Sequence, residues 1–205
     1  MERSRSLLSD IGHEFAALYC SRTDLIDVSG NIFGKSPYFD GQKNFRNALV
    51  QSLAGGNTMV FNKKLRDLFV ALSKKNPKIV SHDWTMYQLA SGTGGKIFYD
   101  EWGSIGYRQH KDNLIGMNRG LRAHLARSAQ FIGGRYRRWN DENLAALKLF
   151  DRDLSRASKE DISEFEKLRS GPSFQSLKNI AYPKFQRQSA LETFALSCGF
   201  FLGLV

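Results

Sequence analysis

Two short runs of side chains could act together on a hydroxyl group and a phosphate. The first is His82-Asp83-Trp84 and the second is Arg108-Gln109-His110. A carboxylate can accept the proton of a hydroxyl, and a guanidinium can grip a phosphate through two parallel hydrogen bonds. An imidazole can bind a metal or donate to a leaving oxygen. Together the two runs suit chemistry on a hydroxyl that lies near a diphosphate.

Strands and helices are both expected around these runs. Apolar and alternating residues predict strands over 16–22, 25–28, 32–33 and 58–61, and a strand pair, 96–99 with 105–109, joined at 100–103. Helical spacing predicts helices over 45–53, 62–72 and 82–90. Asn62 and Ser81 are the expected starts of the last two helices. The sequence therefore predicts an α/β portion up to about residue 115, followed by a helical tail.

The tail is basic and amphipathic. Residues 119–138 contain six arginines and no acidic residue, and further helices are expected over 144–154, after Ser158, and over 183–205. We accordingly expect two parts, 1–118 and 119–205. The tail is commonly a solvated helix face. It could instead contact an anionic membrane through Arg119, Arg122 and Arg127 with Phe131-Ile132 inserted, or a phosphate-bearing acceptor. Nucleic acid ranks last, although the aromatic and basic run 135–139 suits single strands, because no nucleic-acid motif is present.

The bulk composition is that of a globular chain with anionic partners. The 205 residues carry a net charge of +10, with a pI near 9.7, which favours nucleic acid, phosphate-bearing metabolites or anionic membrane surfaces. Cys20 and Cys198 form no CxxC pair, so a reduced, cytoplasmic chain is expected. The most apolar stretch, 194–205, is too short to span a bilayer as a helix.

An ordered set of motifs resembles the second half of a family-two glycosyltransferase, closest to the bacterial rhamnosyltransferase-like enzymes. The motifs run over residues 18–22, Gly55 to Asn62, His82 to Trp84, Tyr107 to His110, and 113–116. No one of them is specific, but their order is. The resemblance covers residues 16 to 118 and extends loosely into the tail.

The resemblance implies a GT-A fold, a nucleotide-sugar donor, a divalent metal (Mg²⁺ or Mn²⁺) and an inverting displacement. It makes Asp83 the general base on the acceptor hydroxyl and places Arg108 and His110 near the donor diphosphate and the metal. Trp84 would border the sugar pocket beside His82, and Gly55-Gly56 would let the backbone approach the ligands. The expected reaction transfers a sugar such as rhamnose to a glycan or a lipid-linked acceptor in surface-polysaccharide synthesis, at the inner face of the membrane.

The family's nucleotide-binding half, with its Asp-rich metal motif, has no counterpart before residue 16. The one DxD triplet, Asp151-Arg152-Asp153, falls in a polar stretch typical of solvated surface. We therefore expect a partial GT-A fold from a truncated, split or mispredicted gene, with residues 16–19 left as an uncovered strand. In the split case, a separate chain would supply the donor half. The alternatives are a non-catalytic remnant that binds a glycan or a partner chain, and a basic nucleic-acid-binding module. Without the resemblance, Asp83 would be a first-turn helix acid and Arg108 a surface ion-pair residue.

Overall fold

The chain folds as a small open mixed sheet packed against helices. The computed structural model describes residues 2–109 and 134–205. The strands are β1 (Ala17–Ile26), β2 (Ile32–Lys35), β3 (Val60–Phe61) and β4 (Lys96–Arg108). The helices are α1 (Glu2–Ser9), α2 (Phe45–Ala48), α3 (Lys63–Ser73), α4 (His82–Gly92), α6 (Arg135–Lys148), α7 (Arg156–Arg169), α8 (Phe174–Ala181) and α9 (Ala190–Phe201). Two 3₁₀ turns, η1 (Gly56–Thr58) and η2 (Asp151–Asp153), complete the described elements.

β1 is the central strand of the sheet. It pairs in parallel with β4 along its whole length, and antiparallel with β2 and β3 on its other edge. Residues 16–19 are therefore buried and paired on both sides, at 0–4% exposure. The expectation that this segment is an uncovered edge was wrong. Among the described strands, β2, β3 and β4 each pair with β1 alone, so β4 is the long edge strand of the sheet.

β4 is one long strand where the sequence predicted a strand pair. Its pairing with β1 continues through the expected turn, because a bulge absorbs the extra residues: Ser21 faces Asp100, and Arg22 faces Gly103. A bulge bends a strand without ending it. The turn-like run 100–103 thus marks a real irregularity, but not a reversal of the chain.

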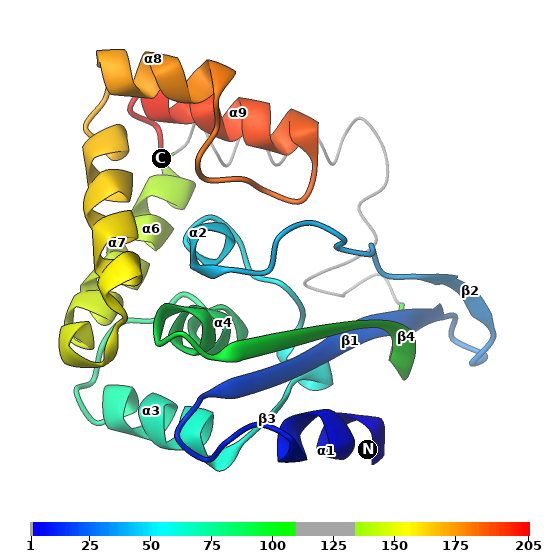
Figure 1. The fold of residues 1–205 in the computed structure, drawn as a ribbon. Helices are drawn as coiled ribbons and strands as arrows, with labels where there is room; N and C mark the ends of the chain where they lie inside the picture. Colours follow the sequence, from blue (N-terminus) through cyan, green and yellow to red (C-terminus); the bar gives the residue numbers. More distant parts are fainter. Residues whose placement is uncertain (1, 110–133) are drawn as a thin grey trace.

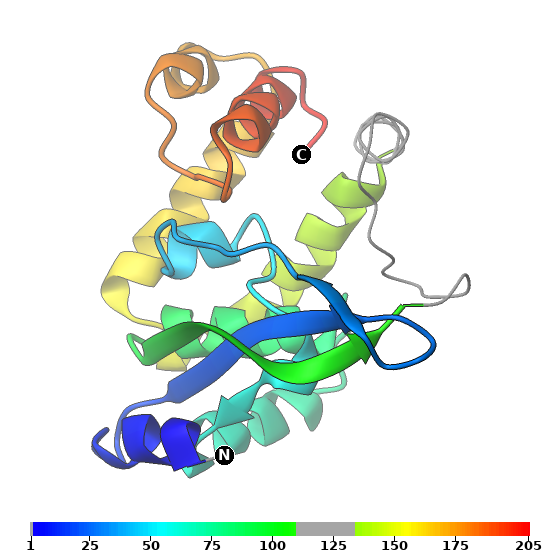
Figure 2. The ribbon, with the colours of Figure 1, turned by 90° about the vertical axis from the view of Figure 1, so that its right-hand side faces the viewer.

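The two faces of the sheet are covered differently. Helices α2, α3 and α4 lie against one face, while α1 lies near the start of β1 on the other (Figures 1 and 2). On the helix-covered face, Leu18 and Cys20 join the main core. On the α1 face, Tyr19 donates to the Asp100 carboxylate at 2.9 Å, and Arg3 pairs with the same carboxylate oxygen at 2.7 Å.

Gly95 joins α4 to β4 and sets their spacing. Its amide donates to Ala90 O, and a Cβ at this position would overlap Ala16 O and lie 2.7 Å from Ala90 O. Both neighbours are backbone atoms, so no side chain can rotate to make room. A glycine is therefore required where the end of α4 passes the start of β1.

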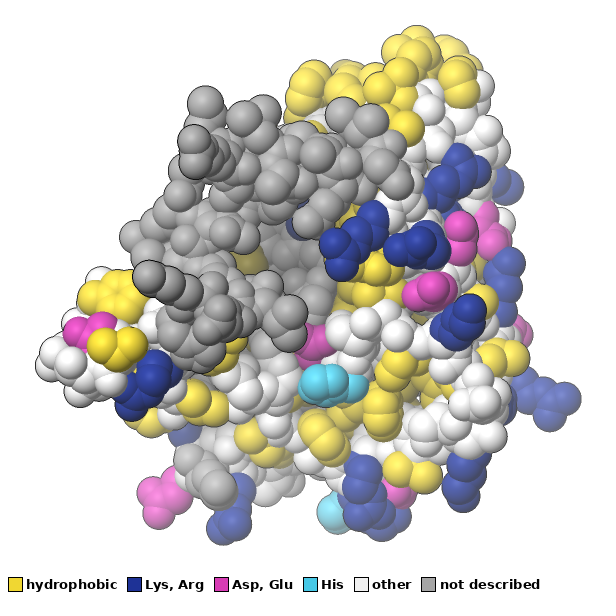
Figure 3. Space-filling view, turned by 180° about the vertical axis from the view of Figure 1, so that it is seen from behind, with side chains coloured by type: hydrophobic (Ala, Val, Ile, Leu, Met, Phe, Trp, Pro, Cys, Tyr) yellow, Lys and Arg dark blue, Asp and Glu magenta, His cyan; other side chains and the backbone are white. Residues whose placement is uncertain are grey.

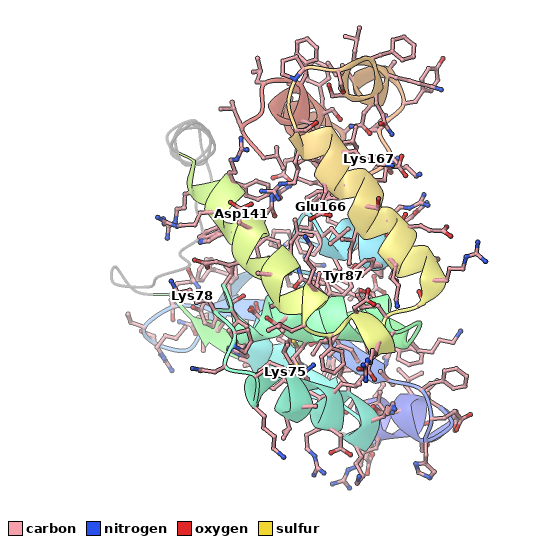
Figure 4. The ribbon with its side chains drawn as sticks, turned by 90° about the vertical axis from the view of Figure 1, so that its left-hand side faces the viewer. Lys75, Lys78, Tyr87, Asp141, Glu166 and Lys167 are labelled. Carbon is pink, nitrogen blue, oxygen red and sulfur yellow. The ribbon has the colours of Figure 1, made fainter. Side chains whose placement is uncertain are left out.

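The later helices complete the same core. Phe165, Phe185 and Phe200 pack together with ring centroids 5.1–6.2 Å apart, all at 0–1% exposure. Seen from the other side, α6 and α7 lie in front of α4, which carries Tyr87 (Figure 4). One hydrophobic cluster runs from Ala16 to Val205 and so crosses the division expected at 118 and 119, which itself falls outside the described residues.

Several helix boundaries differ from the predictions. α3 and α4 lie where expected, and Asn62 accepts from the Leu65 amide as a cap. α2 ends after four residues, yet Phe45, Leu49 and Leu53 are all buried as their spacing indicated. The helix expected over 144–154 is α6, which begins earlier and ends at Lys148. α7 is capped by Ser155, not by Ser158. The helix expected over 183–205 begins only at residue 190.

Candidate functional site

The His82-Asp83-Trp84 run forms the first turn of α4. Ser81 occupies the N-cap position, but its side chain makes no capping hydrogen bond. Asp83 Oδ1 instead accepts from the Trp84 amide at 2.9 Å. A carboxylate is stabilised at a helix N-terminus by the exposed amides and the helix dipole. The half-buried Asp83 carboxylate therefore lies at the N-terminus of α4, a helix whose other residues are largely buried in the core.

Gly56 lies directly against the His82 ring. A Cβ at Gly56 would overlap His82 Nε2 and lie 3.0 Å from Cδ2. The close approach that the resemblance implied for this glycine is made to the imidazole. Thr58, which ends η1, donates its hydroxyl to Gly55 O at 3.0 Å and so closes the turn. The structure thus brings two motifs, far apart in sequence, together at the start of α4.

Trp84 belongs to the core and does not face an open pocket. It is 5% exposed, its indole N–H donates to Ala48 O at 2.6 Å, and its ring meets Trp139 edge-on at 6.5 Å. The expectation that it borders a sugar pocket is therefore corrected. As the third residue of the helix, it is turned inward, so it anchors the first turn of α4 to α2 and α6.

Arg108 is the last residue of β4, where it pairs with Ile26 at the end of β1. Its Nη1 donates to Asp27 O at 3.0 Å and also to Val28 O, in the turn that joins β1 to β2. Figure 1 shows the end of β4 beside β2 and away from α4. Arg108 pairs with Ile26, nine strand steps from Ala17, which is about 30 Å at 3.3 Å per step.

The structure therefore brings Gly56, His82 and Asp83 together and leaves Arg108 apart from them. The guanidinium of Arg108 is bound at the β1–β2 turn, whereas the carboxylate of Asp83 is at the start of α4. His110 lies outside the described residues, as do Arg119, Arg122, Arg127 and Phe131-Ile132 of the basic tail.

A divalent metal would find no ready cluster of protein ligands in the described part of the chain. Within 2–109 and 134–205, no group of three or more His, Cys, Asp or Glu side chains could hold one. Mg²⁺ and Mn²⁺ prefer several oxygen ligands. The Asp151-Arg152-Asp153 triplet forms η2 on the surface, and Asp151 pairs with Lys159 at 2.9 Å. It is solvated surface, as its sequence context indicated.

The aromatic residues of the basic run 135–139 point inward. Tyr136 is 8% exposed and donates to Val50 O, and Trp139 packs against Trp84. Burial raises the pKa of the Tyr136 hydroxyl, so this phenol stays neutral. The described aromatics of this run are therefore not presented for base stacking.

Two features were not anticipated from the sequence. One is the buried carboxylate of Asp100, which lies in a run that resembles a turn. Burial, together with the hydrogen bond to this carboxylate, raises the pKa of Tyr19 to about 12. The Tyr19 hydroxyl therefore remains a donor, and the contact ties the α1 face of β1 to β4. Tyr19 and Asp100 come together only because β1 pairs with β4, and no local sequence pattern predicts this pairing.

The second feature is a cleft of about 830 Å³ between residues 41–47 and 180–194. Its three basic side chains are already paired with acids: Arg46 with Asp161 at 2.8 Å, Arg187 with Glu192 at 3.4 Å, and Lys184 with Glu164. Because these charges are neutralised, the cleft has little preference for anions. Its lining does not include the start of α4.

Comparisons with protein families, with curated proteins and with solved structures give no match for this chain. Among the residues that the structure describes, no helix is long and apolar enough to cross a membrane.

Proposed function

We propose that this chain supplies the acceptor side of an inverting glycosyltransferase with a GT-A-type fold. Asp83 accepts the proton of the acceptor hydroxyl as that oxygen bonds to the anomeric carbon of the sugar. The bond between this carbon and the diphosphate oxygen breaks, and the nucleoside diphosphate leaves with the electron pair. The donor is a nucleotide sugar, such as a nucleotide-linked rhamnose, and the acceptor is a glycan or a lipid-linked glycan. We place the reaction in the cytoplasm.

The contact between Gly56 and the His82 ring is the observation that supports this proposal most. Through this contact, two motifs that the resemblance assigns to one site share one surface of the protein. Asp83 adjoins that surface and, among the described residues, its carboxylate accepts a hydrogen bond only from the Trp84 amide. Oxygen lone pairs thus remain for an acceptor hydroxyl, as a general base requires. His82, exposed beside it, can orient that hydroxyl.

In this proposal, the nucleotide sugar is bound by residues outside the site around Asp83. The proton transfer proposed at Asp83 is written for this carboxylate alone, without a metal ligand from the described residues. Arg108 has no part in the proposed chemistry, because its guanidinium is bonded to the carbonyls of the β1–β2 turn. We propose that a donor-binding half, on this or another polypeptide, binds the nucleotide sugar and presents it to Asp83. A glycan-binding role without catalysis is the alternative that the same site would serve.

The test is a transfer assay that depends on this chain. The chain is incubated with a panel of nucleotide sugars, with and without Mn²⁺, and with and without a donor-binding half supplied in trans. Released nucleoside diphosphate and glycosylated acceptor are both measured. Chain-dependent release together with product supports transfer. Binding of a glycan acceptor with no product under any condition would support the non-catalytic alternative and contradict the proposed reaction.

A further inference from the structure

Helix α9 carries two apolar stripes, and only one of them is used by the core. Leu196 and Phe200 are fully buried, at 0% exposure. Leu191, Phe194 and Leu202 follow the same helical spacing on another side and are 70%, 55% and 62% exposed. A helix that is apolar all round is normally buried on all sides. The second stripe therefore has no partner within the described residues.

Helix α8 adds to the same exposed surface. Phe174 and Leu177 are 84% and 53% exposed, and Tyr182, just after the helix, is 76% exposed. We call the six side chains of both helices the α8–α9 apolar surface. Figure 3 shows hydrophobic side chains gathered at the top of the molecule, where α8 and α9 lie. Contiguous exposed apolar side chains of this kind mark an interaction surface.

A basic ridge borders this surface. Arg135, Arg137 and Arg138 are exposed on the first turns of α6. Arg137 donates to Gly203 O, next to Leu202, so the ridge reaches the end of the α8–α9 apolar surface. Within the described residues, none of the three arginines forms an ion pair with a carboxylate. Lys178, exposed on α8, adds another positive charge between the apolar side chains.

We propose that the α8–α9 apolar surface and the basic ridge together dock the protein on an anionic lipid bilayer. Phe174, Phe194 and their neighbours would enter the headgroup region, and the arginines would contact lipid phosphates, as in peripheral helices with apolar and basic sides. The inference does not depend on the proposed transfer reaction. A second copy of the chain fits less well, because it could cover the apolar side chains but would offer no anionic groups of known position to the three arginines of the ridge, whereas an anionic bilayer supplies both.

The test is vesicle co-sedimentation with the full chain. Wild-type protein is expected to bind vesicles of phosphatidylcholine mixed with phosphatidylglycerol, and to bind pure phosphatidylcholine much more weakly. Phe174→Ser combined with Phe194→Ser lowers the affinity roughly tenfold or more, because two aromatic side chains no longer enter the bilayer. Arg135→Gln combined with Arg138→Gln gives a loss of roughly tenfold on anionic vesicles only.

Matched variants elsewhere on the surface provide the controls. Val28→Ser with Phe33→Ser removes apolar side chains that are 73% and 50% exposed, one in the β1–β2 turn and one in β2. Lys64→Gln with Lys74→Gln removes two exposed charges at α3. Both control pairs should bind like the wild type, and circular dichroism melts should show that all variants fold.

Three results would overturn the proposal. The first is absence of wild-type binding to either kind of vesicle, and the second is unchanged binding by the Phe174→Ser, Phe194→Ser variant. The third is a wild-type dimer that this variant converts to monomer, as measured by light scattering, without a change in vesicle binding. That result would assign the surface to a second copy of the chain.

Discussion

The contact between Gly56 and His82 can be measured by replacing the glycine with alanine. The backbone of Gly56 does not lie in the left-handed region, so alanine fits its conformation, but the new Cβ would overlap the imidazole. Reduced freedom of the unfolded chain favours alanine by about 0.4–1 kcal/mol. Displacing the His82 ring from its rotamer costs about 0.5–1.5 kcal/mol. Gly56→Ala alone should therefore change the free energy of unfolding by less than about 1 kcal/mol.

The diagnostic quantity is the coupling between the two positions. In a His82→Ala background the ring is gone, so Gly56→Ala should show its full stabilising effect. A double-mutant cycle by denaturant unfolding is thus expected to give a coupling free energy of about 0.5–1.5 kcal/mol. Independent sites add within about 0.3–0.5 kcal/mol. Additive effects within that margin would show that the ring does not rest on Gly56, and the paired-motif site would lose its geometric basis.

Two further predictions concern the scaffold that holds the site. Gly95→Ala should lower the free energy of unfolding by about 2–3 kcal/mol, because its Cβ meets two backbone carbonyls that cannot move aside. Gly34→Ala, where the nearest atom is 3.8 Å away, should change it by less than about 1 kcal/mol, and equal losses in the two variants would contradict the packing described. Stability should also fall between about pH 10 and 12. The Tyr19 pKa is about 10 in the unfolded chain and about 12 when folded, so its contribution is full below about pH 10 and is lost progressively as the pH rises to about 12. Denaturant unfolding across this range should show a smaller fall for Tyr19→Phe, and an equal fall would remove Tyr19 as a cause.

Local patterns predicted the elements whose apolar side chains dominate their packing. The strand at 16–22 and the helices at 62–72 and 82–90 all exist, because runs of buried residues and a capping Asn62 specify them without help from distant contacts. The same holds for the turn between β1 and β2. Asp27 accepts from the Asn31 and Ser29 amides there, and these bonds lower the pKa of its carboxyl.

Pairing between distant segments decided the features that the sequence did not predict. The Asp-Glu-Trp-Gly run at 100–103 has the composition of a turn, but β1 continues beside it and keeps β4 extended through a bulge. The site shows the same limit. A local motif placed Asp83 at the start of a helix. The burial of Trp84 and the separation of Arg108 from Asp83 follow instead from how α4 and β4 lie relative to β1.

The most direct measurement of the central claim is transfer activity of Asp83→Asn beside Asp153→Asn. The amide cannot accept the hydroxyl proton, so Asp83→Asn should lower the rate of product formation on the order of 10² to 10⁴-fold. Acceptor binding should stay close to that of the wild type, because the amide still accepts a hydrogen bond. Asp153→Asn changes an exposed residue of η2 and should leave the rate unchanged. Wild-type turnover by Asp83→Asn in the same assay would contradict the assignment of this carboxylate as the base.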